Sequence, residues 1–218
     1  MLDHLRAGEP LDDRDFDHIY PASIREVSDV YWTPVDVARK AALWMAEGGC
    51  RRVLDVGAGV GKFCLVGAAV APEMTFVGIE HRPHLVAVAQ QAARACALRN
   101  VLMLLGSMEV APWRDCDAFY FYNPFDENNF SAGAQLDGTV ELSTKRYMRD
   151  VYFVERCLRA SAVGTRVVTY HGFGGAMPVE YVLEREEPRG VDFLRFWIKG
   201  QPSRRPARER FSHSICAA

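Results

Sequence analysis

The chain has 218 residues, 49% hydrophobic and 25% charged, so it is long and apolar enough to form one globular domain with a substantial core. Its 26 basic and 28 acidic side chains give a net charge of −2, which excludes a general attraction to nucleic acid or to an anionic membrane. No run of about 18 apolar residues occurs, and residues 1–6 lack the basic-then-apolar pattern of a signal peptide, so we expect a cytoplasmic protein without membrane contact.

The cysteines and histidines predict neither disulfides nor a metal site. The six cysteines include no Cys-x-x-Cys pair and most stand in apolar surroundings, which is typical of reduced, structural thiols. His81 and His84 have helical spacing, but no cysteine or further histidine lies nearby in the sequence to complete a metal site.

The first helix is predicted after an N-terminal segment of uncertain role. Residues 1–30 include an acidic run at 12–17, and we expect them to form either a lid over a site or a solvated arm. Thr33-Pro34-Val35-Asp36 then predicts a helix start, with Thr33 as the capping side chain and Pro34 in the first turn. Apolar residues at helical spacing continue until Gly48-Gly49, which end the helix.

Strands and helices alternate from there to residue 170. A helix is expected after a glycine-rich turn at residues 57–61, and two more over 83–97 and 145–159. The predicted strands are 51–56, 75–79, 101–105, 118–122 and 166–170. This alternation predicts a parallel sheet covered by helices on both faces.

The last part of the chain has a different pattern. Residues 180–186 and 192–199 are extended runs joined by 187–190, which predicts a β-hairpin. Residues 201–218 form a basic tail with arginines between positions 204 and 210. We expect a solvated terminus, with phosphate contacts as the alternative.

Three glycines at alternate positions follow the strand at 51–56. Gly57, Gly59 and Gly61 let the backbone turn where a Cβ would clash with a neighbouring chain or a ligand. The dinucleotide fingerprint is Gly-x-Gly-x-x-Gly, and Asp55, two residues before the first glycine, would repel a pyrophosphate. The pattern resembles the first motif of class I S-adenosylmethionine-dependent methyltransferases, which implies cofactor-binding roles for Asp55, the three glycines and Ala58.

A second acidic residue follows at the end of the next predicted strand. Glu80 comes 25 positions after Asp55, and an acidic residue at about this separation bonds the ribose hydroxyls in nucleotide-binding α/β folds. The resemblance also places His81 in the cofactor site. The alternative is that Glu80 favours the helix start at Pro83.

The catalytic residues are expected where the strand at 118–122 ends. Asn123-Pro124-Phe125 resembles the Asn/Asp-Pro-Pro-Tyr/Phe motif of methyltransferases that act on amino nitrogens of adenine, cytosine or glutamine. That resemblance implies that the Asn123 side chain and the Pro124 carbonyl accept the hydrogens of the amino group, while Phe125 stacks on the planar acceptor. This chain has one proline, so the aromatic residue comes one position early, which leaves aliphatic amines open as acceptors. The alternative is a plain turn.

The resemblance names further candidates around the cofactor. Tyr31 and Thr33 belong to a segment that lies against the cofactor in amino-methyltransferases, or they simply pack at the helix start. Ser107 and Met108 follow the strand at 101–105, where the family contacts the adenine, with Glu109 as a substitute. His171 follows the strand at 166–170 and either lines the substrate pocket or has no role.

The family resemblance implies an α/β, doubly wound, mostly parallel seven-stranded sheet of order 3-2-1-4-5-7-6 that ends in an antiparallel hairpin, over residues 31–200. It implies S-adenosyl-L-methionine as the cofactor and methyl transfer, to an amino nitrogen because of the Asn-Pro-Phe motif. The acceptor stays open between a protein side chain, a nucleic-acid base and a small-molecule amine, and the oligomeric state cannot be read. The alternatives are a regulatory or inactive S-adenosylmethionine-binding homologue and a nicotinamide-dependent oxidoreductase.

Overall fold

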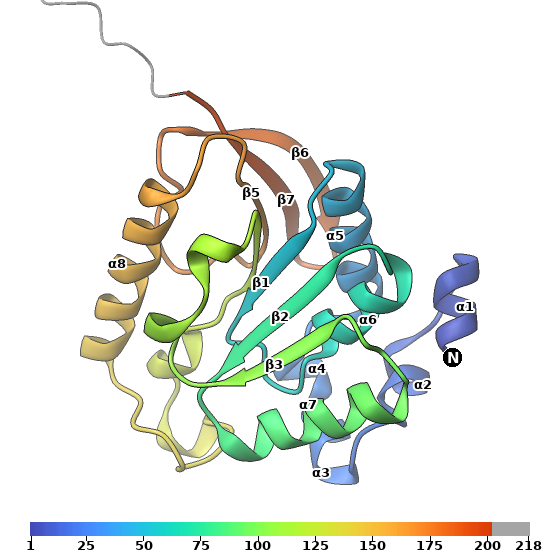
Figure 1. Ribbon diagram of the computed structural model, residues 1–218. Helices are drawn as coiled ribbons and strands as arrows, with labels where there is room; N and C mark the ends of the chain where they lie inside the picture. Colours follow the sequence, from blue (N-terminus) through green and yellow to red (C-terminus); the bar gives the residue numbers. More distant parts are fainter. Residues whose placement is uncertain (202–218) are drawn as a thin grey trace, which may run out of the picture.

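The computed structural model describes residues 1–201 as one sheet between two layers (Figure 1). Seven strands form the order β3-β2-β1-β4-β5-β7-β6, as predicted. The strands are β1 (Arg52–Val56), β2 (Thr75–Glu80), β3 (Val101–Leu105), β4 (Ala118–Tyr122), β5 (Arg166–Tyr170), β6 (Tyr181–Arg189) and β7 (Asp192–Lys199). The first five pair in parallel, whereas β7 pairs antiparallel with both β5 and β6.

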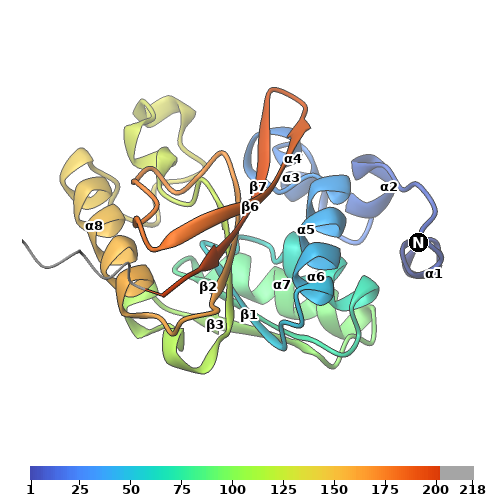
Figure 2. The same ribbon diagram turned by 90° about the horizontal axis from the view of Figure 1, so that it is seen from above.

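Helices cover both faces of the sheet, which Figure 2 shows from above. One face carries α5 (Val35–Glu47), α6 (Lys62–Val70) and α7 (Pro83–Ala95), and the other carries α8 (Thr144–Ala160). The strands alternate accordingly: Val53 and Tyr120 belong to the core under α5 to α7, and Leu54 and Phe121 to the core under α8. Short 3-10 helices fill the remaining connections, at Met108–Val110, Trp113–Asp115, Asp126–Asn129 and Ala132–Ala134.

The first 31 residues pack on the domain. They form α1 (Leu2–Ala7), α2 (Asp13–Asp17), α3 (Ala22–Arg25) and α4 (Ser28–Tyr31). Lys62, at the start of α6, is buried under them and makes ion pairs of 2.6 Å and 2.7 Å with Asp13 and Asp17. Leu5 and Phe16 are buried in the core that includes α6. The N-terminal segment is therefore held on the domain by ion pairs and by apolar contacts.

Two local predictions were wrong. Thr33 does not cap α5, because its hydroxyl accepts a hydrogen bond from Tyr120 (3.3 Å), while Asp13 of the N-terminal segment accepts the hydrogen bond of the Val35 amide (2.9 Å). The hairpin turn does not span 187–190. Arg189 and Asp192 pair with each other across the hairpin, so the turn consists of the two residues between them. Strand β6 includes Pro188 because it is the edge strand, where a missing amide hydrogen is tolerated.

The predicted basic tail falls almost entirely on residues 202–218, which lie outside the described part of the chain. Among residues 1–201, no helix is long and apolar enough to cross a membrane. The five cysteines in that range form no disulfide. No group of three or more His, Cys, Asp or Glu side chains in it is arranged to hold a metal ion.

Candidate active site at the carboxyl ends of the strands

A cavity of about 340 Å³ opens at the carboxyl ends of the parallel strands. At least one residue at or just after the end of each parallel strand lines it, among them Gly57 after β1, Glu80 of β2, Gly106 after β3, Asn123 after β4 and His171 after β5. Open α/β sheets bind their ligands at this edge, because the chain can diverge there and leave a crevice. The sheet topology alone therefore brings together residues that are far apart in the sequence.

The glycine-rich turn forms the floor of this cavity. Gly57 and Gly59 have φ angles of 73° and 54°, in the left-handed region that favours glycine. A Cβ on Gly57 would lie 2.8 Å from the Pro124 Cβ, and one on Gly59 would lie 2.6 Å from the Trp32 ring. The amides of Gly57 and Ala58 both donate to the Ile79 carbonyl, at 3.0 Å each. The turn therefore packs closely against Pro124 and Trp32, and its amides are hydrogen-bonded to β2.

Glu80 ties the turn to the start of α7. One carboxylate oxygen accepts from the Gly59 amide (3.0 Å) and the other from the Arg82 amide (2.8 Å). The side chain is 5% exposed, and burial raises its pKa while these hydrogen bonds partly oppose the rise. Glu80 thus serves the helix start, which was the alternative reading, and also lines the cavity. The ribose role stays a prediction.

The predicted site residues divide into two groups. Gly57, Gly59 and seven others line the cavity: Tyr31, Glu80, His81, Ser107, Met108, Glu109 and His171. Asp55, Ala58, Gly61 and Thr33 do not line it. All three residues of the Asn-Pro-Phe motif do.

Asn123 has a backbone that few residues adopt. Its φ is 40°, and its amide donates to the Gly172 carbonyl (3.0 Å), so the ends of β4 and β5 are joined. Within the described chain, neither its side chain nor the Pro124 carbonyl has a hydrogen-bond partner. Both residues line the cavity, and these two acceptors have no partner in the described chain. Phe125 is 6% exposed and packs in the core under α8.

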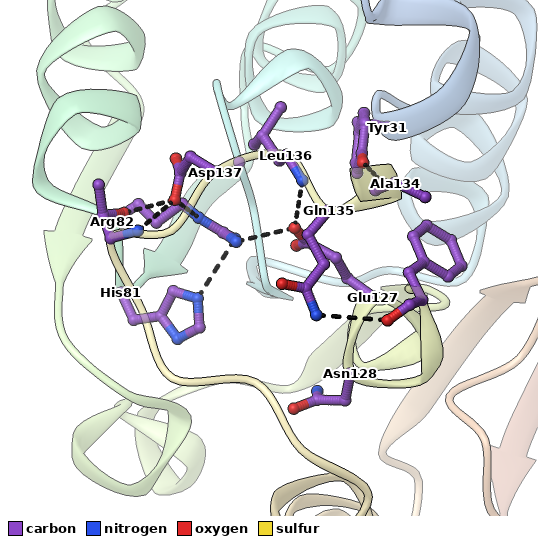
Figure 3. A network of polar contacts seen from close by, with 12 residues as sticks. Tyr31, His81, Arg82, Glu127, Asn128, Ala134, Gln135, Leu136 and Asp137 are labelled. Carbon is purple, nitrogen blue, oxygen red and sulfur yellow. Dashed lines mark hydrogen bonds and ion pairs between the residues drawn. The ribbon is translucent and has the colours of Figure 1, made fainter. Parts of the chain in front are cut away.

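A segment that sequence reasoning missed crosses the cavity, and Figure 3 shows its contacts. We call residues 126–139 the strap. The buried Arg82 side chain pairs with Glu127 (2.9 Å) and Asp137 (3.1 Å) of the strap, and Glu127 also accepts from the Leu136 amide (2.6 Å). From the opposite side, the Tyr31 hydroxyl donates to the Ala134 carbonyl (2.6 Å). The strap is thereby fixed to α7 and to the N-terminal segment.

Two histidines of the cavity differ in their surroundings. The Nδ1 of His81 lies 2.7 Å from the Arg146 guanidinium, and burial together with Arg146 and Arg82 lowers its pKa to about 4. His81 is thus a neutral side chain whose Nδ1 accepts a hydrogen bond. His171 instead faces a carboxylate, with Nδ1 2.9 Å from Asp192 at the start of β7, and its φ of 57° is left-handed. Asp192 was not predicted, because only the antiparallel pairing of β7 with β5 brings it there.

Comparisons with known proteins agree with this geometry. Residues 49–132 match a family model described as a methyltransferase domain. This match covers 84 of the 218 residues, and over them the chain is similar to a methyltransferase domain. The match confirms the predicted resemblance to S-adenosylmethionine-dependent methyltransferases but does not test the Asn-Pro-Phe motif. The observed strand order confirms the predicted fold class, and S-adenosyl-L-methionine is the cofactor of this class of domain.

Individual relatives are distant or match only in part. The chain is 46% identical over 59 residues to a tRNA (guanine-N(7)-)-methyltransferase of Microcystis aeruginosa, a match that covers 27% of this chain and 28% of that protein. An RNA methyltransferase of Salinibacter ruber, solved with S-adenosyl-L-homocysteine, superposes with a TM-score of 0.56 at 19% identity, over 78% of this chain and 94% of the other. A methyltransferase of Geobacter sulfurreducens superposes with a TM-score of 0.59 at 15% identity, over 90% of this chain and 95% of the other. These structural similarities show the fold alone.

Asp55 lies beneath the cavity rather than in its wall. It is 4% exposed, its one side-chain partner in the described chain is the Cys64 thiol (3.5 Å), and burial raises its pKa from 3.8 to about 7. Asp55 does not line the cavity, and its predicted role in cofactor binding stays a prediction.

Asp55→Asn should stabilise the protein at neutral pH. Since the folded-state pKa lies above the unfolded one, the folded protein binds the proton more tightly, and its stability falls as the pH rises from about 4 to about 7. The amide carries no such cost, so the advantage of the variant should grow over that window to on the order of 2–4 kcal/mol. Urea unfolding at both ends of the window measures it, with the exposed Asp115→Asn as control. A difference that does not change with pH would contradict this account of Asp55.

Proposed function

We propose that this protein transfers the methyl group of S-adenosyl-L-methionine to an amino nitrogen. One observation carries the proposal: Asn123 and Pro124 line the same cavity as the glycine-rich turn and Glu80, and in the described chain neither the Asn123 side chain nor the Pro124 carbonyl has a hydrogen-bond partner. A regulatory or inactive homologue would need the turn and Glu80 but not these acceptors.

The cavity suits a cationic cofactor. Its wall contains five carboxylates against three guanidinium groups, namely Glu80, Glu109, Asp126, Glu127 and Asp150 against Arg82, Arg146 and Arg149. This balance favours a sulfonium and opposes a pyrophosphate, which argues against the nicotinamide alternative. Gly57 and Gly59 would leave room for the nucleoside, Glu80 would hold its ribose, and Ser107 with Met108 would lie at its base. When bound, the cofactor supplies an electrophilic methyl group.

The reaction needs the amino group to be positioned against the methyl group, and then one proton to be removed from the methylated nitrogen. A C–N bond forms as the C–S bond breaks, which leaves a proton too many on the methylated nitrogen. Hydrogen bonds to Asn123 and Pro124 orient the amino group before transfer. In this proposal His171 accepts the proton afterwards: its Nδ1 lies 2.9 Å from the Asp192 carboxylate, and a proton held on that side leaves Nε2 as the accepting position. The other candidates are less suited, because His81 Nδ1 is engaged by Arg146, and burial raises the pKa of Tyr122 to about 12.

Among the predicted acceptors we favour a nucleic-acid base. The partial relative from Microcystis aeruginosa is a tRNA methyltransferase, and the Salinibacter ruber protein with the same fold is an RNA methyltransferase. Guanine N7, which the name of the first relative specifies, is a ring nitrogen without hydrogen, so the preference for a planar exocyclic amine rests on the Asn-Pro-Phe motif alone. An asparagine oxygen and a proline carbonyl can accept the hydrogens of such an amine. Incubation of the protein with methyl-labelled cofactor and separate RNA, protein and metabolite fractions of a lysate tests this: label should enter RNA. Label in another fraction would overturn the RNA acceptor, and label in none would overturn methyl transfer.

Asn123→Ala should lower methyl transfer by roughly 10²-fold or more, the scale of a lost positioning contact, while affinity for S-adenosylhomocysteine changes little. Asn123→Asp should be less damaging, since it keeps an accepting oxygen. Labelled transfer and calorimetry on the same preparations measure the two effects. If Asn123→Ala retains near-normal turnover, the motif is a turn and the acceptor is oriented elsewhere.

His171→Ala should lower the turnover number roughly 10²-fold, with part of it restored by added imidazole, which can enter the space left and accept the proton. Asp192→Asn should give a smaller loss, because it weakens only the orientation of the imidazole ring. Unchanged turnover in His171→Ala would assign proton removal to solvent. A loss that imidazole does not restore would point to a structural role.

A further inference from the structure

A second, shallower groove lies at the opposite end of the sheet from the cavity. It runs between the amino ends of β1, β4 and β5 and the last turn of α8. We call it the arginine groove and define it by Arg51, Arg52, Arg114 and Arg156, with Trp113 among them. Two more arginines line it but are engaged elsewhere: Arg159 pairs with Glu155, and Arg166 donates to the Gly164 carbonyl.

The four defining arginines have no acidic partner. Within residues 1–201, no carboxylate oxygen lies within 4.0 Å of any of their guanidinium nitrogens. Asp117 belongs to the same groove, but its carboxylate accepts from the backbone amides of Arg51 (2.9 Å) and Arg52 (3.0 Å). By contrast, the arginines around the cavity, such as Arg82 and Arg146, are paired with carboxylates. Glu109 and Asp115 also line the groove, so six arginines stand against three carboxylates there. The groove is therefore a local positive region on a protein whose net charge is −2.

An aromatic ring lies among these charges. Trp113 is half-buried, and its indole nitrogen donates to the Met108 carbonyl (2.7 Å), which fixes the ring at the groove. Phe153 of α8 lines the groove beside it, with the two ring centroids 6.3 Å apart. Guanidinium groups next to a fixed aromatic ring suit phosphates and bases, because the cations bind the backbone and the ring stacks on a base.

The described chain ends at the rim of this groove. The Lys199 carbonyl accepts from the amide of Gly164, a groove residue, at 2.8 Å, and Gln201 follows two positions later. Figure 1 shows the end of α8 and the end of β7 on the same side of the molecule. The sequence beyond, residues 202–218, has four arginines and one glutamate.

We propose that the arginine groove binds the phosphate backbone of RNA, as a docking surface separate from the cavity where the methyl group is transferred. The proposal rests on the proposed RNA acceptor. Because the cavity wall itself is acidic, it offers a polyanion little attraction, and an external cationic surface supplies the binding that the cavity does not. An acidic protein segment would use the cations but not the aromatic ring, so the groove favours nucleic acid.

The test is binding of fluorescein-labelled bulk tRNA and of an unstructured single-stranded RNA to the full chain, followed by anisotropy across a salt series. Arg114→Glu with Arg156→Glu, both exposed, should weaken binding by about tenfold or more and reduce the salt slope by about 1 to 2. Arg94→Glu with Arg99→Glu is the matched control: the same charge change on exposed arginines outside the groove, expected to change affinity by less than about threefold. Circular dichroism of each variant confirms folding.

Equal loss in the two double variants would overturn the proposal, because the effect would then reflect net charge and not the groove. Binding of polyglutamate in preference to both RNAs would also overturn it and would favour an acidic protein partner. Failure of the proposed function is a separate result. If S-adenosylhomocysteine does not bind, or if no fraction accepts a methyl group, the proposed methyl transfer is refuted. The RNA-binding measurement still shows whether the arginine groove binds RNA.

Discussion

The site depends on one buried carboxylate. Glu80 accepts the amides of Gly59 and Arg82 at the same time, so it sets the position of the glycine-rich turn relative to the start of α7. An unpaired buried carboxylate is costly, and these two hydrogen bonds offset that cost. Arg82 continues the chain of contacts, since its backbone meets Glu80 and its side chain holds Glu127 and Asp137 of the strap. The floor and the cover of the cavity are thus joined through two consecutive contacts.

The opposite wall depends on the sheet order. Strands β4 and β5 are neighbours, and each is followed directly by a residue with a left-handed backbone, Asn123 after β4 and His171 after β5. Such conformations cost on the order of 1–3 kcal/mol and persist where the surrounding structure enforces them. Here the Asn123 amide is bound to the Gly172 carbonyl, and His171 is held by Asp192 of β7. The antiparallel hairpin therefore ends the sheet and also supplies Asp192, which holds His171 at the cavity.

The sequence predicted what depends on local pattern. The strand ends, the glycine spacing and the position of Glu80 follow from periodicity and from motifs within a few dozen residues, and the family resemblance added the sheet order. What it missed are contacts between distant segments: Lys62 with Asp13 and Asp17, Arg82 with Asp137, and His171 with Asp192. The predicted cap at Thr33 was wrong for the same reason, because Asp13 from the preceding segment accepts the hydrogen bond of the Val35 amide. No pattern in one sequence shows which charged residues will meet across the fold.

The central claim is that the Glu80 side of the cavity binds a sulfur nucleoside. Isothermal titration calorimetry of the full chain with S-adenosylhomocysteine and with NAD tests it most directly, using Glu80→Ala and, as control, the exposed Glu73→Ala. The account predicts binding of S-adenosylhomocysteine and none of NAD. Loss of the charged hydrogen bond in Glu80→Ala should weaken affinity by roughly 5- to 150-fold, equivalent to about 1–3 kcal/mol, with Glu73→Ala unchanged. Tight binding of NAD without affinity for the sulfur nucleoside would contradict it.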